Sequence, residues 1–257
     1  MILFGFAACV LKLKWRYKLI MPLFVSLPLI VSYNESTTII IPAFLSKFLS
    51  SSLNIGKAYY IYIMLYTVFV PNSINIHAGL NGLEVGQCII IGSAITLYNT
   101  MKLNSIPLSL PNERSLHLIS ITLIFPFIAA SLALFNKNKY PAEVFVGNAY
   151  TYFAGMVFVV IGLYGHYSKA VLLFIVPQIL NFILSFPQLI GVIKCPKHRL
   201  PALNSGTLKL ECVHHHFTLI NAFLRIFGPT NEKQTVTMLL LFQALCCSLG
   251  LLYLYAS

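Results

Sequence analysis

The sequence VFVGNAYTYFAGM, residues 144–156, opens the stretch that decides the fold, and IKCPKHRLPALN, residues 193–204, closes it. Between them lie two long apolar runs that only residues 165–168 separate. Runs of this length predict membrane-spanning helices, and two helices joined by so short a turn are antiparallel. We therefore expect the polar loops at the two outer ends to face each other at one membrane surface.

The composition extends this expectation to the whole chain. Of its 257 residues, 58% are hydrophobic and only 9% are charged, and the mean hydropathy is +0.82. Soluble domains of this length do not have such a composition, and the apolar runs are too long for the strands of a barrel. The sequence predicts an all-α, polytopic membrane protein. We expect about eight membrane segments, at residues 1–11 (incomplete), 19–33, 58–74, 83–101, 115–135, 149–165, 168–193 and 236–255.

The basic residues predict an orientation in the membrane. The formal net charge is +11, from 17 Lys and Arg against six acidic residues, all of them Glu. Twelve of the 17 basic residues fall on one side of the predicted membrane, in loops near residues 11–18, 136–149 and 191–235. The positive-inside bias makes that side cytosolic. The sequon NES at residues 34–36 falls on the opposite side, where a glycosylated asparagine belongs. The charge therefore indicates a membrane rather than nucleic acid.

Four polar loops on the predicted cytosolic side carry unusual chemistry. They are LKLKWRYK at residues 11–18, NSINIHAGLNGLE at 72–84, YPAEVFVGNAY at 140–150 and CPKHRLP at 195–201. Together they offer cations, amides and turn-forming glycines at one surface, and polar groups so close to a bilayer suggest function. Arg grips a phosphate with two hydrogen bonds, and Lys acts as a point charge. This set suits a nucleotide diphosphate that meets a lipid phosphate.

The first three of these loops also have a simpler interpretation. The first is typical of a basic juxtamembrane anchor. The amides of the second could join helices by hydrogen bonds. Asn148 in the third could be a helix N-cap. Cys212 with His214, His215 and His216 leaves a soft-metal site open as a minor alternative.

Several of these motifs resemble those of a known family. INIHAGLNGLEVGQ at residues 74–87, VFVGNAYTYFAGM, CPKHRLPALN at 195–204 and GFAACVLKLKWRYKLIMP at 5–22 are similar to motifs of glycosyltransferase family 4. Its members are polyprenyl-phosphate phosphoglycosyl transferases, among them the bacterial translocase that loads phospho-MurNAc-pentapeptide onto undecaprenyl phosphate. The resemblance runs through essentially the whole chain and is greatest to the eukaryotic branch that acts on dolichyl phosphate.

The resemblance implies a fold and an activity. It implies ten transmembrane helices, so that residues 1–257 form a single domain that lacks the family's N-terminal helices. It implies transfer of GlcNAc-1-phosphate from UDP-GlcNAc to dolichyl phosphate with release of UMP, the first step of lipid-linked oligosaccharide synthesis. It also implies Mg²⁺ as a cofactor, a multi-pass location in the endoplasmic reticulum membrane with a cytosolic active face, and a homodimer or a heteromer with a full-length homologue.

The resemblance also assigns substrate-binding residues. Asn81 falls on a position that contacts uracil, and Phe145 falls on the residue that stacks near the base. Lys197 falls on a position that contacts the pyrophosphate. His198 and Arg199 fall in the loop that reads GlcNAc and its phosphate.

Catalytic and metal positions follow in the same way. Lys18 falls on a second pyrophosphate-contacting position and is a candidate catalytic residue. Asn75 falls on a magnesium-coordinating position. Asn148 stands where the family's VFVGD motif has its magnesium-binding Asp. It is therefore a second catalytic candidate, after Lys18, and a second metal-binding candidate, after Asn75.

The chain departs from the family pattern where acids are expected. Ala8 and Cys9 replace the acidic pair of the family's GFADDV, and Lys12 replaces an Asn that follows it. The chain has no Asp, so Glu84 and Glu143 are the acids expected near the site. Because Mg²⁺ prefers charged oxygen ligands, the alternative is a catalytically inactive relative. Such a relative would bind the nucleotide sugar, the polyprenyl phosphate or a full-length homologue, or be a fragment without a function.

Overall fold

A computed structural model describes residues 1–11, 13, 15–33, 37–40, 52–194, 196 and 199–256. The sequon at 34–36, Lys12, Lys197 and His198 lie outside these ranges. The described helices are α1 Ile2–Val10, α2 Trp15–Ser32, α3 Ala58–Ile76, α4 Leu83–Ser105, α5 Pro111–Asn138, α6 Gly147–Tyr164, α7 Ser168–Phe174, α8 Val176–Leu189, α9 Leu219–Phe227 and α10 Glu232–Ala256. Two small antiparallel hairpins complete this part of the chain, one of β1 Thr38–Ile40 with β2 Ser52–Asn54 and one of β3 Ala202–Asn204 with β4 Lys209–Glu211. The predicted all-α class is confirmed.

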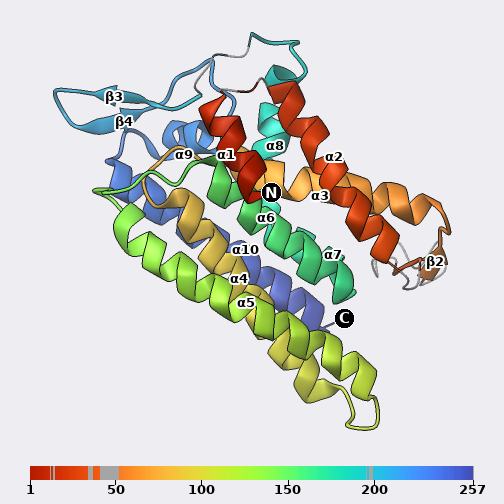
Figure 1. Cartoon of the computed structure of the whole chain (residues 1–257). Helices are drawn as coiled ribbons and strands as arrows, with labels where there is room; N and C mark the ends of the chain where they lie inside the picture. Colours follow the sequence, from red (N-terminus) through yellow and green to blue (C-terminus); the bar gives the residue numbers. More distant parts are fainter. Residues whose placement is uncertain are drawn as a thin grey trace.

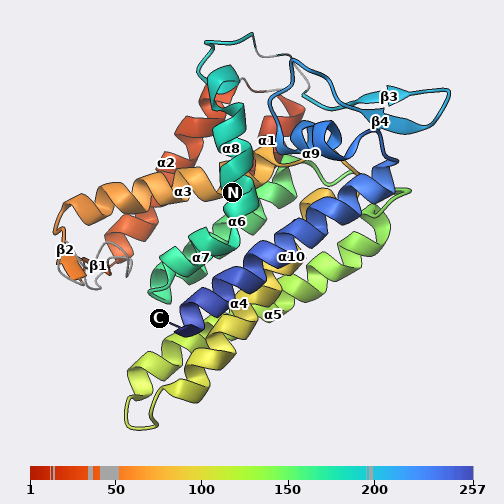
Figure 2. The same cartoon turned by 180° about the vertical axis from the view of Figure 1, so that it is seen from behind.

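The helices pack as an elongated bundle with a polar end. The helices α4, α5 and α10 lie side by side along its length, and α6 packs against α3 and α1 (Figures 1 and 2). The helices α1 and α9 and the β3–β4 hairpin gather at the upper end in both views. The largest buried apolar cluster joins α3, α4, α6 and α7. This core fixes the ends of α3 and α6, which carry the candidate site.

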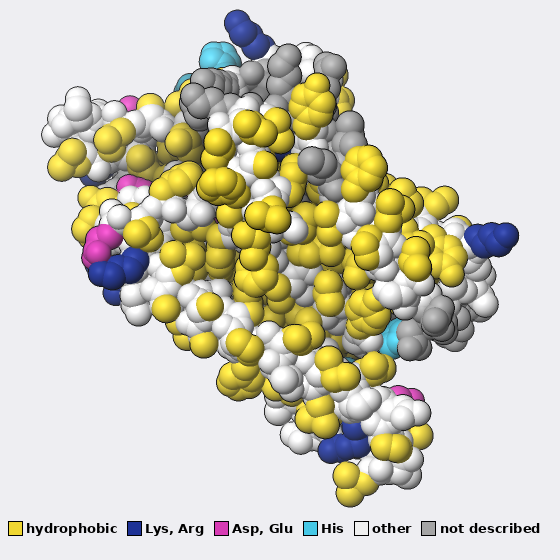
Figure 3. All heavy atoms as spheres, viewed as in Figure 1, with side chains coloured by type: hydrophobic (Ala, Val, Ile, Leu, Met, Phe, Trp, Pro, Cys, Tyr) yellow, Lys and Arg dark blue, Asp and Glu magenta, His cyan; other side chains and the backbone are white. Residues whose placement is uncertain are grey.

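The membrane-spanning character resides in a subset of the helices. In the described part, α5, α6 and α10 are long and apolar enough to cross a membrane, and the bent pair of α7 and α8 makes a fourth span if it is counted as one. Helices occur in all eight expected segments, but in the described part α1 is too short and α3 and α4 are not apolar enough to count as spans by themselves. In α3 the reason is polar residues such as Asn72, Ser73 and Asn75, which meet partners inside the protein. Figure 3 shows apolar side chains over the middle of one face and charged ones toward its edges.

The second helix of the expected hairpin is broken. The turn after α6 is as predicted, but α7 and α8 meet at Ile175 with a bend of 71°. Pro177, in the first turn of α8, explains the break, because it has no N–H with which to continue the helical hydrogen bonds. At the break, the main-chain oxygen of Phe174 accepts a hydrogen bond from Gln243 Nε2 on α10, at 2.7 Å.

The closest approach of α3 and α6 depends on a glycine. A Cβ atom on Gly155 of α6 would collide with the Cα of Pro71 on α3. Any side chain at this position would therefore push the two helices apart. The contact lies next to the hydrogen bonds that join the polar ends of the same two helices.

We expect Gly155→Ala to destabilise the protein, because overpacking of a close helix contact costs about 1–3 kcal/mol. Thermal unfolding of the purified protein in detergent, followed by circular dichroism, measures the change. Gly250→Ala is the matched control, since the nearest atom to a Cβ there is 3.4 Å away, an ordinary contact. Equal midpoints for the two variants would contradict the close packing of α3 and α6.

Candidate functional site

The first part of the site is the crossing of α1 and α6. Gly5 lets the two main chains approach, because a Cβ there would press against the main-chain oxygen of Asn148. The main-chain N–H of Asn148 donates a hydrogen bond to Cys9 Sγ at 3.2 Å. Cys9 is exposed, and Asn148 is half-buried. The N-cap of α6 is Val146, so the interpretation of Asn148 as an N-cap is wrong. The positions of the family's acidic pair and of its VFVGD motif therefore meet in space.

The second part is the polar end of α3, which two side chains of α6 hold. Thr151 Oγ1 donates to Asn75 Oδ1 at 2.8 Å and also lies 3.2 Å from the main-chain oxygen of Asn148. Tyr152 OH donates to Asn72 Oδ1 at 2.9 Å in a fully buried bond. Thr151 thus links the two residues that were expected to bind magnesium. Sequence reasoning missed Thr151 and Tyr152, although both lie one helical turn after Asn148.

The third part is the loop between α3 and α4, residues 77–82, which two carboxylates shape. Glu84 Oε1 accepts a hydrogen bond from the N–H of Gly79 at 2.9 Å. Glu232 Oε1, from the first turn of α10, accepts from the N–H of Asn81 at 2.7 Å. Glu232 lies 151 residues from Asn81 in sequence, so no local pattern predicts this contact. The loop that carries Asn81 is therefore held by carboxylates already engaged with main-chain amides.

His77 begins this loop and is not a cation. The side chain is 2% exposed, and burial lowers the pKa of His77 to about 4. The ring is therefore neutral near pH 7. His77 therefore supplies no positive charge for a phosphate.

The fourth part is the cationic loop after α8, residues 195–201, of which Pro196, Arg199, Leu200 and Pro201 are described. Asn221 Nδ2 on α9 donates to the main-chain oxygen of Arg199 at 3.3 Å, and His216 Nδ1 hydrogen-bonds the main-chain oxygen of Leu200 at 2.7 Å. The side chain of Leu200 packs onto Gly79, so this loop meets residues 77–82 directly. His216 thus belongs to a contact that fixes the cationic loop. The soft-metal alternative for the histidine run gains no support from the structure.

The remaining predicted residues lie further out. Phe145 is 88% exposed, and its ring borders Gly147 at the start of α6. Lys18 lies in the first turn of α2 and is half-buried. Glu143 forms an exposed ion pair with Lys137 at 2.7 Å, so it is engaged at the surface. The structure therefore links Asn75 with Asn148 through Thr151, and it links the Arg199 loop with the loop that carries Asn81 through Leu200 and Gly79. It shows no such link for Lys18 in the described part.

The oxygen atoms gathered here fit Mg²⁺ poorly. They are Asn75 Oδ1, Thr151 Oγ1 and the main-chain oxygen of Asn148, all of them neutral. Mg²⁺ prefers charged oxygen ligands in a near-octahedral shell, and both nearby carboxylates accept main-chain hydrogen bonds. Within the described ranges, no group of three or more His, Cys, Asp or Glu side chains could hold a metal ion. We therefore assign no chemical step to a metal.

An apolar groove leads toward the site from the membrane region. It has a volume of about 370 Å³ and lies between α3 and the α7–α8 pair. Its lining is formed by Tyr62, Leu65, Tyr66, Val68, Phe69, Asn72, Leu172 and Phe182. The groove's polar end is Asn72, the residue that Tyr152 hydrogen-bonds. An extended apolar chain lying in this groove would have its end beside the polar cluster.

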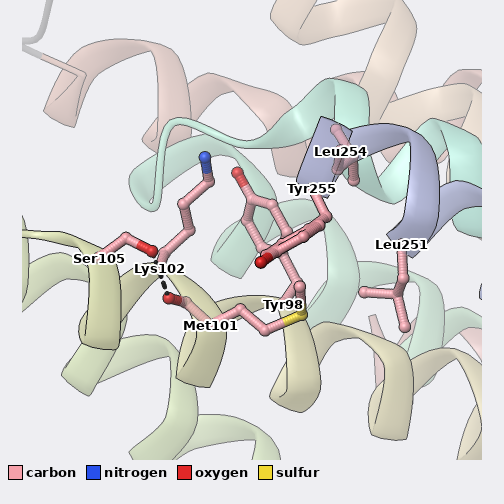
Figure 4. A pocket seen from close by; sticks show the side chains of 7 residues that line it. All are labelled: Tyr98, Met101, Lys102, Ser105, Leu251, Leu254 and Tyr255. Atoms are coloured by element: carbon pink, nitrogen blue, oxygen red, sulfur yellow. Dashed lines mark hydrogen bonds between the residues drawn. The ribbon is translucent and has the colours of Figure 1, made fainter. Parts of the chain in front are cut away.

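A smaller cavity of about 100 Å³ lies between the ends of α4 and α10 (Figure 4). Lys102 extends along it with its Nζ 5.8 Å from the ring centre of Tyr98, and Tyr255 closes the other side. These helix ends lie away from α1, at the opposite end of α4 from residues 77–82 (Figure 1). This cavity is therefore separate from the candidate site.

Comparisons with known proteins agree with the grouping of these segments. The sequence profile described as glycosyl transferase family 4 matches residues 1–166, which include Cys9, Asn75, Asn81 and Asn148. Three relatives are named UDP-N-acetylglucosamine–dolichyl-phosphate N-acetylglucosaminephosphotransferase. They come from Dictyostelium discoideum (45% identical over 97% of this chain and 65% of the relative), Saccharomyces cerevisiae (38%, 94% and 63%) and Leishmania amazonensis (34%, 99% and 68%).

The chain spans about two thirds of the length of these relatives. The family profile covers more than half of the chain. The chain therefore belongs to glycosyl transferase family 4.

Proposed function

We propose that this chain transfers GlcNAc-1-phosphate from UDP-GlcNAc to dolichyl phosphate and releases UMP. The observation that carries the proposal is the meeting of four segments at one polar end. The end of α1, the loop 77–82, the start of α6 and the Arg199 loop come together there, beside an apolar groove. The names of the relatives supply the two substrates.

The contacts suggest how the substrates would lie. Asn81 and Phe145 would bind the uracil. Arg199 would bind the phosphates, since a guanidinium can form two parallel hydrogen bonds to a phosphate. The isoprenoid chain would occupy the α3–α8 groove and bring its phosphate to Asn72. Phosphoryl transfer depends mainly on positioning and on neutralising charge, so Lys18, Lys197 and His198 complete the proposed site.

The magnesium dependence implied by the resemblance is open to direct measurement. The neutral oxygens of Asn75 and Asn148 make a weak ion site. Transfer should therefore be measured with added Mg²⁺ and again with a chelator.

The second candidate function is binding without transfer. The specific observation in its favour is that the two adjacent residues Cys9 and Asn148 carry no charge. In that case the chain would hold UDP-GlcNAc or dolichyl phosphate, alone or beside a full-length homologue or a second copy.

A transfer assay distinguishes these functions. Membranes that contain only this chain would receive labelled UDP-GlcNAc, dolichyl phosphate and Mg²⁺. The proposal predicts tunicamycin-sensitive label in the lipid fraction and an equal amount of released UMP. Retained UDP-GlcNAc binding without transfer would establish the second function, and the loss of both would overturn the two together.

We also propose that the chain lies in the endoplasmic reticulum membrane with this site on the cytosolic side. The support is the excess of basic residues in the loops that border the site. A UDP-sugar made in the cytosol reaches such a site without crossing the membrane.

We expect Gly79→Ala to weaken UDP-GlcNAc binding about tenfold. A residue other than glycine in a backbone conformation with positive φ costs about 1–3 kcal/mol. Gly79 has φ +111° and supports Leu200. The added methyl group would push Leu200 away and separate the two loops. A binding titration measures the effect.

Gly56→Ala is the matched control for this variant. Gly56 also has positive φ, +52°, but nothing lies within 4 Å of a Cβ there. If both variants bound UDP-GlcNAc like the unmodified chain, the contact between the two loops would have no role in binding.

A further inference from the structure

Three glutamine side chains meet inside the bundle. Gln87 on α4, Gln178 on α8 and Gln243 on α10 are each 2% exposed or less. A buried amide without hydrogen bonds destabilises a fold, so three of them in contact indicate a connected network. The network lies between the break of the α7–α8 pair and the loop 77–82.

Main-chain oxygens at the two ends of the network fix the direction of its hydrogen bonds. Gln87 Nε2 donates to the main-chain oxygen of His77 at 2.9 Å. Gln243 Nε2 donates to the main-chain oxygen of Phe174 at 2.7 Å. The oxygens of both side chains must therefore accept, and Gln178 Nε2 donates to the two of them, at 2.6 Å and 2.7 Å. Gln178 is the only one of the three that donates both of its protons to other side chains.

The network joins two functional parts of the molecule. At one end is Phe174, whose main-chain oxygen lies at the helix break. Leu172 and Phe182, on either side of that break, line the apolar groove. At the other end is His77, which begins the loop that carries Asn81. A shift in the bend of α7 and α8 therefore reaches this loop through side-chain hydrogen bonds alone.

We propose that Gln87 and Gln178 are positioning residues that set the loop 77–82 for nucleotide binding and couple it to the groove. The proposal rests on the proposed function, because it concerns the affinity for UDP-GlcNAc. Gln87 holds the loop, and Gln178 aligns Gln87 from the first turn of α8. A polyprenyl phosphate in the groove should then strengthen UDP-GlcNAc binding, and the reverse follows by linkage.

The test compares Gln87→Met and Gln178→Met with Gln243→Met in the purified full chain. Methionine keeps the side-chain length but cannot donate. Losing one buried hydrogen bond at the loop should raise the Kd for UDP-GlcNAc about tenfold in the first two variants. The third is equally buried and removes the hydrogen bonds of Gln243 to Phe174 and to Gln178. Gln178 still donates to Gln87 there, so the Kd should change less than about twofold. Because only folded molecules titrate, a smaller folded fraction does not change the Kd.

A second measurement follows the loop itself. Hydrogen exchange of residues 77–82 should be faster in Gln178→Met than in Gln243→Met, and the milder Gln178→Asn should fall between them. A short-chain polyprenyl phosphate should tighten UDP-GlcNAc binding in the unmodified chain, but not in Gln178→Met or Gln243→Met, because each variant breaks the hydrogen-bonded path from Phe174 to His77. These results would support the inference.

The outcomes separate the inference from the proposed function. If the unmodified chain binds UDP-GlcNAc and all three variants bind it with the same Kd, the inference is wrong and the proposed function stands. If the unmodified chain does not bind UDP-GlcNAc, both are wrong. Equal weakening by all three variants would mean that the network serves stability alone, which also overturns the inference.

Discussion

The double variant Cys9→Asp/Asn148→Asp is expected to raise the rate of GlcNAc-1-phosphate transfer by about a thousandfold, equivalent to about 4 kcal/mol of barrier. The two residues are in contact, with the N–H of Asn148 3.2 Å from Cys9 Sγ. Two carboxylates at these neighbouring positions would repel each other unless a cation lies between them. They would therefore favour Mg²⁺, whose charge stabilises a transferring phosphate by several kcal/mol.

The transfer assay with labelled UDP-GlcNAc measures this gain, with Mg²⁺ and with a chelator. Cys9→Asn is the matched control, because it places a side chain of the same size but without charge beside Asn148. Ala8 is left unchanged, since it is 2% exposed against Phe4 and Tyr152 and a charge there would be buried. An equal gain in the neutral control, or a gain that survives the chelator, would contradict the argument.

The helices and much of the site could be predicted from local sequence. The long apolar runs predicted the helices, because a run of that length is typical of a helix that crosses the apolar interior of a membrane. Motif resemblance grouped Cys9, Asn75, Asn81 and Asn148, and the structure links the first with the last directly and Asn75 with Asn148 through Thr151. Their roles in binding and transfer stay predictions until the assays are made.

The rest depends on contacts between residues that are distant in the sequence. Glu232 shapes the Asn81 loop from the first turn of α10, and no pattern near either residue indicates it. The bend at Ile175 could not be predicted, because residues 168–193 form one long apolar run in the sequence. A proline such as Pro177 occurs both in the first turn of a new helix and at a kink within one helix, and the local sequence does not distinguish the two. Gln178 reads as an isolated polar residue in an apolar helix, and only the packing of α4 and α10 shows its partners.

Arg199→Ala is expected to weaken UDP-GlcNAc binding by about 30-fold, because a hydrogen bond to a charged group contributes about 1.5–3 kcal/mol. The main chain of this loop is held by Asn221 at Arg199 and by His216 at Leu200. Both hydrogen bonds are to main-chain oxygens, so the truncation removes the charge and leaves these two bonds in place.

The series around Arg199 distinguishes lost charge from lost geometry. Arg199→Lys keeps the charge but not the paired hydrogen bonds, so its Kd should lie between those of the unmodified chain and Arg199→Ala. Arg225→Ala is the matched control, since this arginine lies on α9 with its guanidinium turned to the main-chain oxygen of His214 at 3.4 Å. Added salt should weaken binding by the unmodified chain more than by Arg199→Ala, because screening acts on the charge that the variant lacks. An unchanged Kd in Arg199→Ala would mean that other basic residues of the proposed site bind the phosphates. The Arg199 loop would then serve only to hold Gly79 and its neighbours through Leu200.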